Sequence, residues 1–470
     1  METKRSSFSG KLGFILAAAG SAVGLGNIWR FPYLAAKYGG GIFLLVYLIL
    51  AVTFGFALMC VETALGRKTG QSAINAFGQL SKKHKYIGLL AAAVPILIMP
   101  YYSVIGGWVM KYLTMFISGD MFSAAAAYDP NLNVIVAEGT EKARTFFDIF
   151  VAQTSEPIIF FLLFLGLTSL IVLFGVEKGI EKVSKLMMPV LVVLTLGIAI
   201  YTMTMPGAMD GVLYYITPDF SKFSVNTVLS AMGQLFYSMS LAMGIMITYG
   251  SYMKKDVSIE KSVRSIELFD TGIAFLAGMM IIPAVFSFSG GNEAALGKGP
   301  GLMFGTLPKV FNSLGDVMGT GLGILFFVLV LFAALTSSIS LMETVISIFR
   351  DKFGWGRKFT CAFVFVLCIV LGLPSSLGFG VLSDITIGGK NFLDMFDFFT
   401  NSILMPVVAL LTCYFVGYVI TPKPISDEIA LTGKFKSQKL FEIIIKYVAP
   451  ICIVLILISS VLDGLGIVKL

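Results

Sequence analysis

Long apolar runs separated by short polar loops organise this chain of 470 residues. A helix needs about 20 mainly apolar residues to cross about 30 Å of hydrocarbon. These runs are too long to be barrel strands, so the pattern predicts membrane-spanning helices. We expect eleven of them, at about residues 12–36, 41–66, 86–117, 157–175, 180–204, 226–252, 264–289, 319–349, 359–379, 393–419 and 440–465.

The composition excludes a water-soluble fold. Hydrophobic residues make up 57% of the chain and charged residues only 13%, whereas soluble domains carry about 25% charged residues. The five cysteines all lie within apolar runs, so we expect neither a disulfide framework nor a zinc site. The net charge of +7 comes from cations in short loops, a distribution that indicates membrane orientation rather than nucleic-acid binding.

Lysine and arginine predict the orientation. They gather before the first run and then in every second loop, at residues 4–11, 67–85, 178–185, 254–264, 350–358 and 423–439. Cytoplasmic loops carry the excess of these residues. We therefore expect a multi-pass protein of the cell (inner or plasma) membrane, with a cytoplasmic N-terminus and contacts to membrane lipid.

Two of the predicted helices carry glycine and polar residues at mid-membrane. Residues 20–27 contain three glycines and an asparagine, and residues 238–244 form a second small and polar patch. Close packing of small residues is an equal explanation for the first patch alone. The patches lie five helices apart, however, and paired breaks in two inverted halves mark a transporter site. An unwound turn would free carbonyls for a cation and amides for a carboxylate.

The sequence around the first patch, GSAVGLGNIWRFP at residues 20–32, resembles the first-helix signature of the neurotransmitter:sodium symporters. Further similar motifs cover nearly the whole chain: ETALGR (62–67), GIEK (179–182), PGA (206–208), PDFS (218–221), QLF (234–236) and LTSS (335–338). The chain is most similar to the bacterial amino-acid branch, whose members are LeuT-like.

The resemblance implies an all-α membrane protein and not an enzyme. Its fold would be the LeuT-type 5+5 inverted repeat, with discontinuous helices 1 and 6. We expect one domain over residues 1–470, with repeats at about 8–204 and 226–420 and an extra helix at about 440–465. Its function would be sodium-coupled uptake of an amino acid by alternating access, with about two sodium ions.

The resemblance also implies two sodium sites, built from carbonyls and side-chain oxygens, the ligands that a hard cation prefers. The first site would use Ala22, Asn27, Ser238 and Asp270, together with the substrate carboxylate. The second site would use the carbonyls of Gly20, Val23 and Ala333 and the hydroxyls of Thr336 and Ser337.

The same resemblance implies a substrate site between the two broken helices. The substrate carboxylate would meet the amides of Leu25 and Gly26 and the hydroxyl of Tyr102, and the amine would meet nearby carbonyls. The full set of substrate-binding residues would be Ala22, Leu25, Gly26, Ile98, Tyr102, Tyr237, Ser238, Ser240, Met243, Ser337 and Leu341.

Two charged pairs are expected to gate this site. By the resemblance, Arg30 and Asp397 would close the outer path, and Arg5 and Asp351 would close the inner path. Charges so near apolar spans are costly unless they are paired. Phe8 stands where the family commonly has tryptophan, and it would help to close the inner path.

Asp270 departs from the family pattern, because many members have asparagine there. Many animal members use chloride for charge balance, and position 274, beside that site, is alanine here. We expect Asp270 to supply the negative charge, so that transport does not need chloride. We also expect it to bind a proton when sodium leaves.

The sequence is compatible with two sizes of substrate side chain. Ala242 stands where some members have glycine, and its methyl would disfavour bulk, whereas Met243 is flexible and can repack. A neutral, hydrophobic amino acid is favoured, and alanine or glycine is the alternative. A proton-coupled amino acid permease is the rival mechanism, and its uptake would survive replacement of sodium by choline. The sequence does not predict an oligomeric state.

Overall fold

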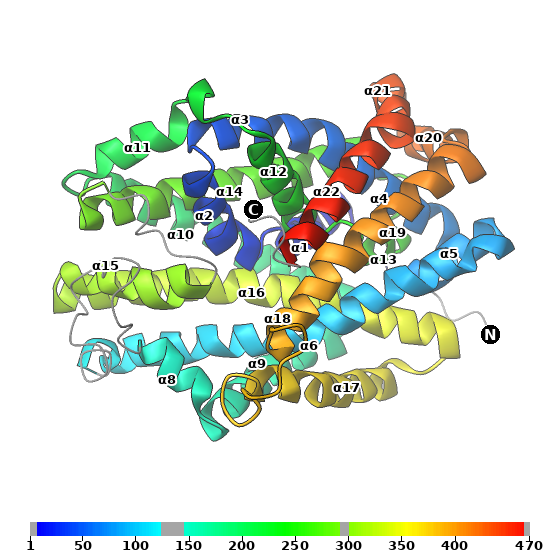
Figure 1. The fold of residues 1–470 in the computed structure, drawn as a ribbon. Helices are drawn as coiled ribbons and strands as arrows, with labels where there is room; N and C mark the ends of the chain where they lie inside the picture. Colours follow the sequence, from blue (N-terminus) through cyan, green and yellow to red (C-terminus); the bar gives the residue numbers. More distant parts are fainter. Residues whose placement is uncertain (1–6, 124–144, 292–299, 465–470) are drawn as a thin grey trace.

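The computed structural model describes residues 7–123, 145–291 and 300–464. Helices dominate these residues, and they lie roughly along one direction in a single bundle (Figure 1). Arg5 lies outside the described residues.

Nine continuous helical segments of the described chain are long and apolar enough to span a membrane. They are Gly41–Thr69, Lys82–Ser118, Ser155–Leu173, Val176–Met203, Ile259–Ser289, Asp316–Phe353, Arg357–Leu377, Phe392–Val419 and Gln438–Leu462. The α-helices within them are α3 (Gly41–Leu50), α4 (Phe56–Thr69), α6 (Lys85–Ser118), α9 (Ser155–Leu173), α10 (Lys182–Met203), α14 (Ile259–Ser289), α16 (Asp316–Phe353), α17 (Arg357–Leu377), α18 (Phe392–Asp397), α19 (Met405–Tyr414), α21 (Gln438–Ile443) and α22 (Ala449–Gly464).

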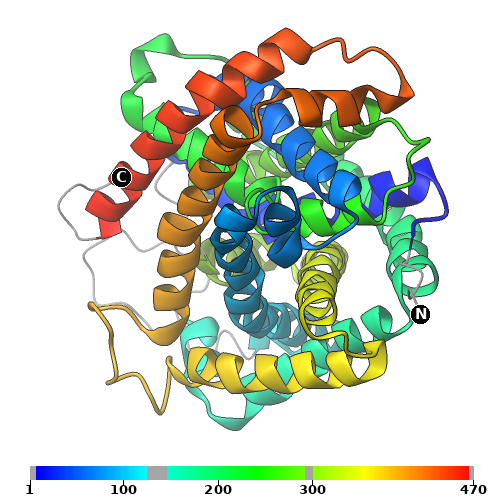
Figure 2. The same ribbon diagram turned by 90° about the vertical axis from the view of Figure 1, so that its right-hand side faces the viewer.

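Shorter helices connect or cover the spans. They are α5 (Ala73–Leu80), α8 (Phe146–Ala152), α11 (Ala208–Ile216), α15 (Leu307–Ser313) and α20 (Lys423–Ile429). The C-terminal helices α19, α21 and α22, orange and red in Figure 2, lie along the outside of the bundle.

The first predicted span is broken, as expected. Helix α1 (Lys11–Ala22) ends before two non-helical residues, Val23 and Gly24, and a π-helical turn (Gly26–Arg30) then leads into α2 (Phe31–Lys37). The two halves are bent by 52°. Gly24 lies at the break, and a Cβ atom there would lie 2.6 Å from Ser337 Oγ, so only glycine lets this segment approach α16 so closely.

The sixth predicted span is also broken, and its break is longer. Helix α12 (Val225–Ser238) and helix α13 (Ile245–Ser251) are separated by residues 239–244. Ser240 and Ala242 have φ angles of 52° and 59°. A left-handed conformation costs an L-residue about 1–2 kcal/mol, so neighbouring contacts must hold this segment open.

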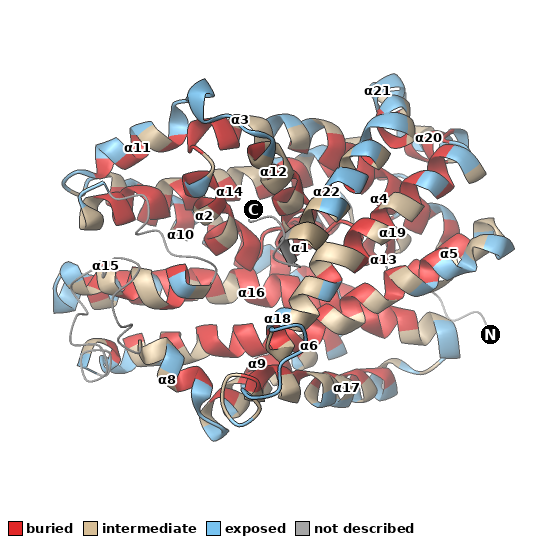
Figure 3. Cartoon of the chain, viewed as in Figure 1, coloured by how far each residue is buried: buried red, intermediate tan, exposed pale blue. Residues whose placement is uncertain are grey.

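Burial divides the spans into an inner and an outer set (Figure 3). In Lys82–Ser118 and Asp316–Phe353, 72% of the most apolar stretch is buried, against 33% in Ser155–Leu173 and Gln438–Leu462. Helix α16 packs against α1, α6 and α10 and so stands at the centre. The outer spans expose apolar side chains in rows, for example Leu186 and Val193, which are 68% and 69% exposed. Lipid would cover such rows, whereas water would not.

Candidate functional site

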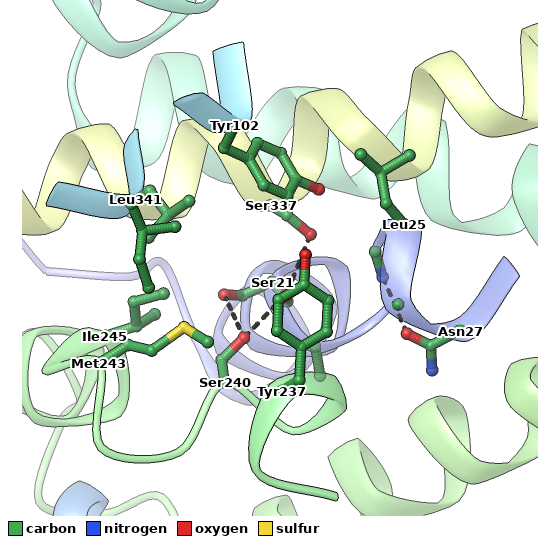
Figure 4. A pocket seen from close by; sticks show the side chains of 14 residues that line it. Ser21, Leu25, Asn27, Tyr102, Tyr237, Ser240, Met243, Ile245, Ser337 and Leu341 are labelled. Carbon is green, nitrogen blue, oxygen red and sulfur yellow. Dashed lines mark hydrogen bonds between the residues drawn. The ribbon is translucent and has the colours of Figure 1, made fainter. Parts of the chain in front are cut away.

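A cavity of about 360 Å³ lies where the two broken helices meet (Figure 4). All of its lining residues are buried except Tyr237, which is partly buried. Its lining consists of Ser21, Ala22, Gly24, Leu25, Gly26, Asn27, Ile98, Tyr102, Tyr237, Ser240, Met243, Ile245, Ser337 and Leu341. The structure therefore brings together every residue predicted to bind substrate except Ser238, whose hydroxyl bonds Asp270 instead.

The cavity has two chemically different ends. Met243, Ile245 and Leu341 form an apolar wall on one side, and the backbone around Leu25 lies on the other (Figure 4). Between them, the buried hydroxyl of Tyr102 lies near Ser337 and the Leu25 backbone and makes no hydrogen bond of standard geometry within the described residues. A buried hydroxyl without a partner is costly, so this oxygen is available to a ligand.

Hydrogen bonds from two elements converge on one carbonyl of α1. The Ser21 carbonyl accepts bonds of 3.0 Å from both Ser240 Oγ and Ser337 Oγ (Figure 4). These bonds join the unwound segment of the sixth span, the end of α1 and the middle of α16. The cavity is therefore surrounded by three elements that are fixed to one another.

Asp270 is the centre of the first predicted sodium site. Its Oδ1 accepts hydrogen bonds of 2.7 Å from both Asn27 Nδ2 and Ser238 Oγ, and its Oδ2 accepts one of 3.2 Å from Tyr47 OH. Asp270 is fully buried on α14. The structure thus gathers Asn27, Ser238 and Asp270 beside the break in the first span, where Ala22 ends α1.

The second predicted sodium site lies where α1 contacts α16. Thr336 Oγ1 donates to the Ala333 carbonyl at 3.1 Å. A Cβ atom on Gly20 would lie 3.1 Å from Thr336 Cβ, which shows how closely the two backbones approach. Ser337 Oγ lies 3.5 Å from the Gly20 carbonyl, and Val23 is the C-cap residue that follows α1. All five residues predicted to bind the second sodium ion therefore lie on α16 or at the end of α1.

The predicted outer gate residues line a second hollow, of about 1760 Å³, beyond Tyr237. The Arg30 guanidinium lies over the Tyr237 ring, with 5.4 Å from Cζ to the ring centroid. Asp397 accepts hydrogen bonds from Tyr101 and Asn401, at 3.3 and 2.5 Å. The ion pairs among the described residues do not join Arg30 to Asp397.

Aromatic contacts and hydrogen bonds gather on the predicted inner side. Phe8 is 1% exposed and packs edge-on against Tyr249, with 5.5 Å between ring centroids. Asp351 accepts a hydrogen bond of 2.7 Å from the Ser72 amide. Tyr252 donates a hydrogen bond of 2.8 Å to the buried Glu343.

Sequence comparison agrees with this geometry. A model of the sodium:neurotransmitter symporter family matches residues 5–132 and 148–465. The chain belongs to this family. The uncharacterized sodium-dependent transporter YhdH of Bacillus subtilis strain 168 is 33% identical to this symporter over 98% of both chains.

Two further comparisons place the symporter among characterised proteins. The crystal structure of MhsT in complex with L-phenylalanine matches 97% of this chain and 100% of that one, with a TM-score of 0.83 and 38% identity. The human sodium- and chloride-dependent taurine transporter is 26% identical over 88% of this chain and 72% of its own. The predicted family, LeuT-type fold and sodium-coupled transport are confirmed: the symporter is a multi-pass membrane transporter and not an enzyme.

One residue of this symporter was underestimated from the sequence. Glu62, on α4, has no role predicted from the sequence beyond its place in the ETALGR motif, but its Oε1 accepts a 2.6 Å hydrogen bond from the Ala242 amide. This bond helps to hold the left-handed backbone of the sixth span. An acidic residue in the middle of an apolar run is itself a signal of function. Ala242 does not line the cavity, so the size argument made from its methyl does not apply directly.

Proposed function

We propose that this symporter takes up a neutral, hydrophobic amino acid together with sodium. The observation that carries the proposal is the cavity itself, whose lining has backbone and hydroxyl groups at one end, apolar side chains at the other and no charged side chain. The polar end suits the carboxylate and amine of a zwitterion, and the apolar end suits an uncharged side chain. The relative MhsT was crystallised with L-phenylalanine, which has this chemistry.

The proposed sodium sites are those predicted from the sequence. Asn27, Ser238 and Asp270, with the Ala22 carbonyl and the substrate carboxylate, would hold one ion. Thr336 and Ser337, with the carbonyls of Gly20, Val23 and Ala333, would hold the other. The first ion would touch both the protein and the substrate, and this shared contact would couple their binding.

We also propose that transport does not require chloride. Tyr47 and Ser238 direct their hydroxyls at the Asp270 carboxylate. The Asp270 carboxylate thereby occupies hydroxyl donors that a chloride ion would otherwise need. Ala274 on the same helix is buried and offers no ligand. This arrangement would distinguish the symporter from its chloride-dependent animal relatives.

Alternating access would then follow from the two repeats, at about residues 8–204 and 226–420, with the extra helix at about 440–465. Counted in chain order from the sequence, the first, second, sixth and seventh spans would rock against the third, fourth, eighth and ninth spans. Arg30 and Asp397 would approach one another when the outer path closes, and Arg5 and Asp351 would separate when the inner path opens. The N-terminus would face the cytoplasm.

A thermal-shift screen of the purified symporter against the twenty amino acids tests the substrate. Ligands that bind the native state raise its stability by mass action. We expect hydrophobic amino acids to raise the melting temperature in sodium but not in potassium. Stabilisation by alanine or glycine alone would favour the smaller-substrate alternative. Proteoliposome uptake that persists when choline replaces sodium would instead favour a proton-coupled permease.

A further inference from the structure

A third hollow lies away from the transport path, at one end of the bundle. This basic groove, of about 1460 Å³, is formed by α5, the start of α6 and the end of α16. Its lining consists of Gln71, Ile74, Asn75, Gly78, Gln79, Lys82, Lys85, Tyr86, Leu89 and Lys352. Three lysines line it and no carboxylate does.

Within the described residues, the lysine side chains of the groove form no ion pair. Lys82, Lys85 and Lys352 are exposed, and the ion pairs found in the described parts of the chain include none of them. The neighbouring acid, Asp351, accepts a hydrogen bond from the Ser72 amide and does not line the groove. The groove therefore concentrates positive charge that an external anion would neutralise.

The groove also lies at the boundary of the membrane. The span Lys82–Ser118 begins at its lysines, and the span Asp316–Phe353 ends beside Lys352. On the membrane side of the lysines, Tyr86 and Leu89 are 44% and 60% exposed. Cationic side chains next to exposed apolar and aromatic ones match the headgroup and the upper acyl chain of a lipid.

We propose that the basic groove binds one anionic phospholipid. Its phosphate would lie among Lys82, Lys85 and Lys352, and its acyl chain would follow Leu89 along α6. Gln71, Asn75 and Gln79 offer neutral hydrogen-bonding groups to the rest of the headgroup. Basic pockets between helices at a membrane surface hold such headgroups through charge.

The occupied groove would also brace the inner side of the transporter. Asn75 Nδ2 donates a 3.0 Å hydrogen bond to the Asp351 carbonyl and so ties α5 to the end of α16. A lipid that bridges Lys82 and Lys352 would reinforce the same joint. Amide exchange in α5 should therefore slow when the lipid is bound.

The test measures lipid binding to the full-length symporter by native mass spectrometry from detergent, with phosphatidylglycerol and phosphatidylcholine as probes. The variant K82Q/K85Q/K352Q removes the charge of the groove. The matched control K434Q/K436Q/K439Q removes the same charge from exposed lysines elsewhere. We expect wild type and control to prefer phosphatidylglycerol, and the groove variant to lose about fivefold in affinity for each lysine.

Two outcomes would overturn the proposal. One is equal phosphatidylglycerol binding by the groove and control variants. The other is displacement of the lipid by millimolar inorganic phosphate or by an acidic peptide, which would make this a site for a soluble anion. Should the triple variant show no melting transition, the single variants K82Q and K352Q give the same reading, with about a fivefold loss expected from each.

Discussion

Ser9 and Glu181 are joined by two hydrogen bonds across 172 residues of sequence. The Ser9 amide donates to Glu181 Oε2 at 2.8 Å, and the Ser9 hydroxyl donates to Oε1. Lys185 lies 2.6 Å from the same carboxylate, and Lys254 donates to the Ser9 carbonyl at 2.9 Å. The chain ahead of α1 is thereby fixed to the start of the fifth span, on the side that Phe8 closes.

The first prediction concerns this contact. E181Q removes the charge that strengthens both Ser9 bonds, and charged hydrogen bonds are about twice as strong as neutral ones. We expect amide exchange at residues 8–14 to accelerate about tenfold, which corresponds to about 1.4 kcal/mol. Hydrogen-exchange mass spectrometry of the substrate-free protein measures this exchange rate. E177Q is the control, because Glu177 is exposed on the same turn, and equal exchange in both variants would contradict the prediction.

The breaks in the first and sixth spans could be predicted from the sequence. Glycine, serine and asparagine are poorer helix formers than alanine or leucine, and their recurrence five spans apart indicates two matching breaks. The family motif then assigned oxygen ligands residue by residue, and the structure gathers these residues at the breaks.

Other features depend on tertiary contacts that no local pattern records. Ala242 is a strong helix former, yet its backbone is left-handed because residues 239–244 are held by Glu62 and other partners. Arg30 and Asp397 form no ion pair among the described residues, and under the proposed alternating access they would approach one another only at another step of the cycle. Motifs identify such gate residues but carry no information about that step.

The second prediction separates two neighbouring tyrosines on α6. Within the described chain, Tyr102 OH makes no hydrogen bond of standard geometry, so Y102F should change the unfolding free energy without substrate very little. It should weaken amino acid binding about tenfold or more, because a hydrogen bond to a charged carboxylate is lost. Isothermal titration in sodium measures the affinity.

Y101F is the matched comparison. Tyr101 OH bonds both Asp397 and Thr400, at 3.3 Å each. Its removal should therefore lower the unfolding free energy by about 1 kcal/mol. If Y102F lowers stability and leaves substrate affinity intact, the hydroxyl has a structural role instead.

The third prediction concerns the buried carboxylate of Asp270. D270N keeps the shape of the side chain but removes the negative charge beside the proposed sodium ion. We expect the sodium concentration for half-maximal substrate binding to rise at least about tenfold, since a buried pairing with a cation is lost. Wild-type uptake into proteoliposomes should be unchanged when gluconate replaces chloride.

E267Q is the control for D270N. Glu267 lies one turn earlier on α14 and faces Arg264, 3.8 Å away, rather than the proposed sodium ligands. Its sodium dependence should match that of wild type. Chloride-dependent uptake by the wild-type symporter would refute the charge-balance argument.

The fourth prediction concerns a buried ion pair on the cytoplasmic side of the predicted topology. Arg67 Nε donates to Glu428 Oε1 at 2.8 Å, and the side chains of the two residues are 1% and 8% exposed. Arg67 also donates to the Val257 carbonyl at 2.7 Å. It thus joins α4, the segment before α14 and α20.

R67M should lower the free energy of unfolding by about 3–5 kcal/mol, because Glu428 would remain charged, buried and unpaired. The double variant R67M/E428L removes that charge and should recover more than half of the loss, as apolar replacements of buried ion pairs do elsewhere. Chemical unfolding in detergent measures all three forms. K68M, at the next and exposed position, should be neutral. A double variant as unstable as R67M would mean that the lost bonds to the carbonyls of Val257 and Glu428, and not the stranded carboxylate, dominate.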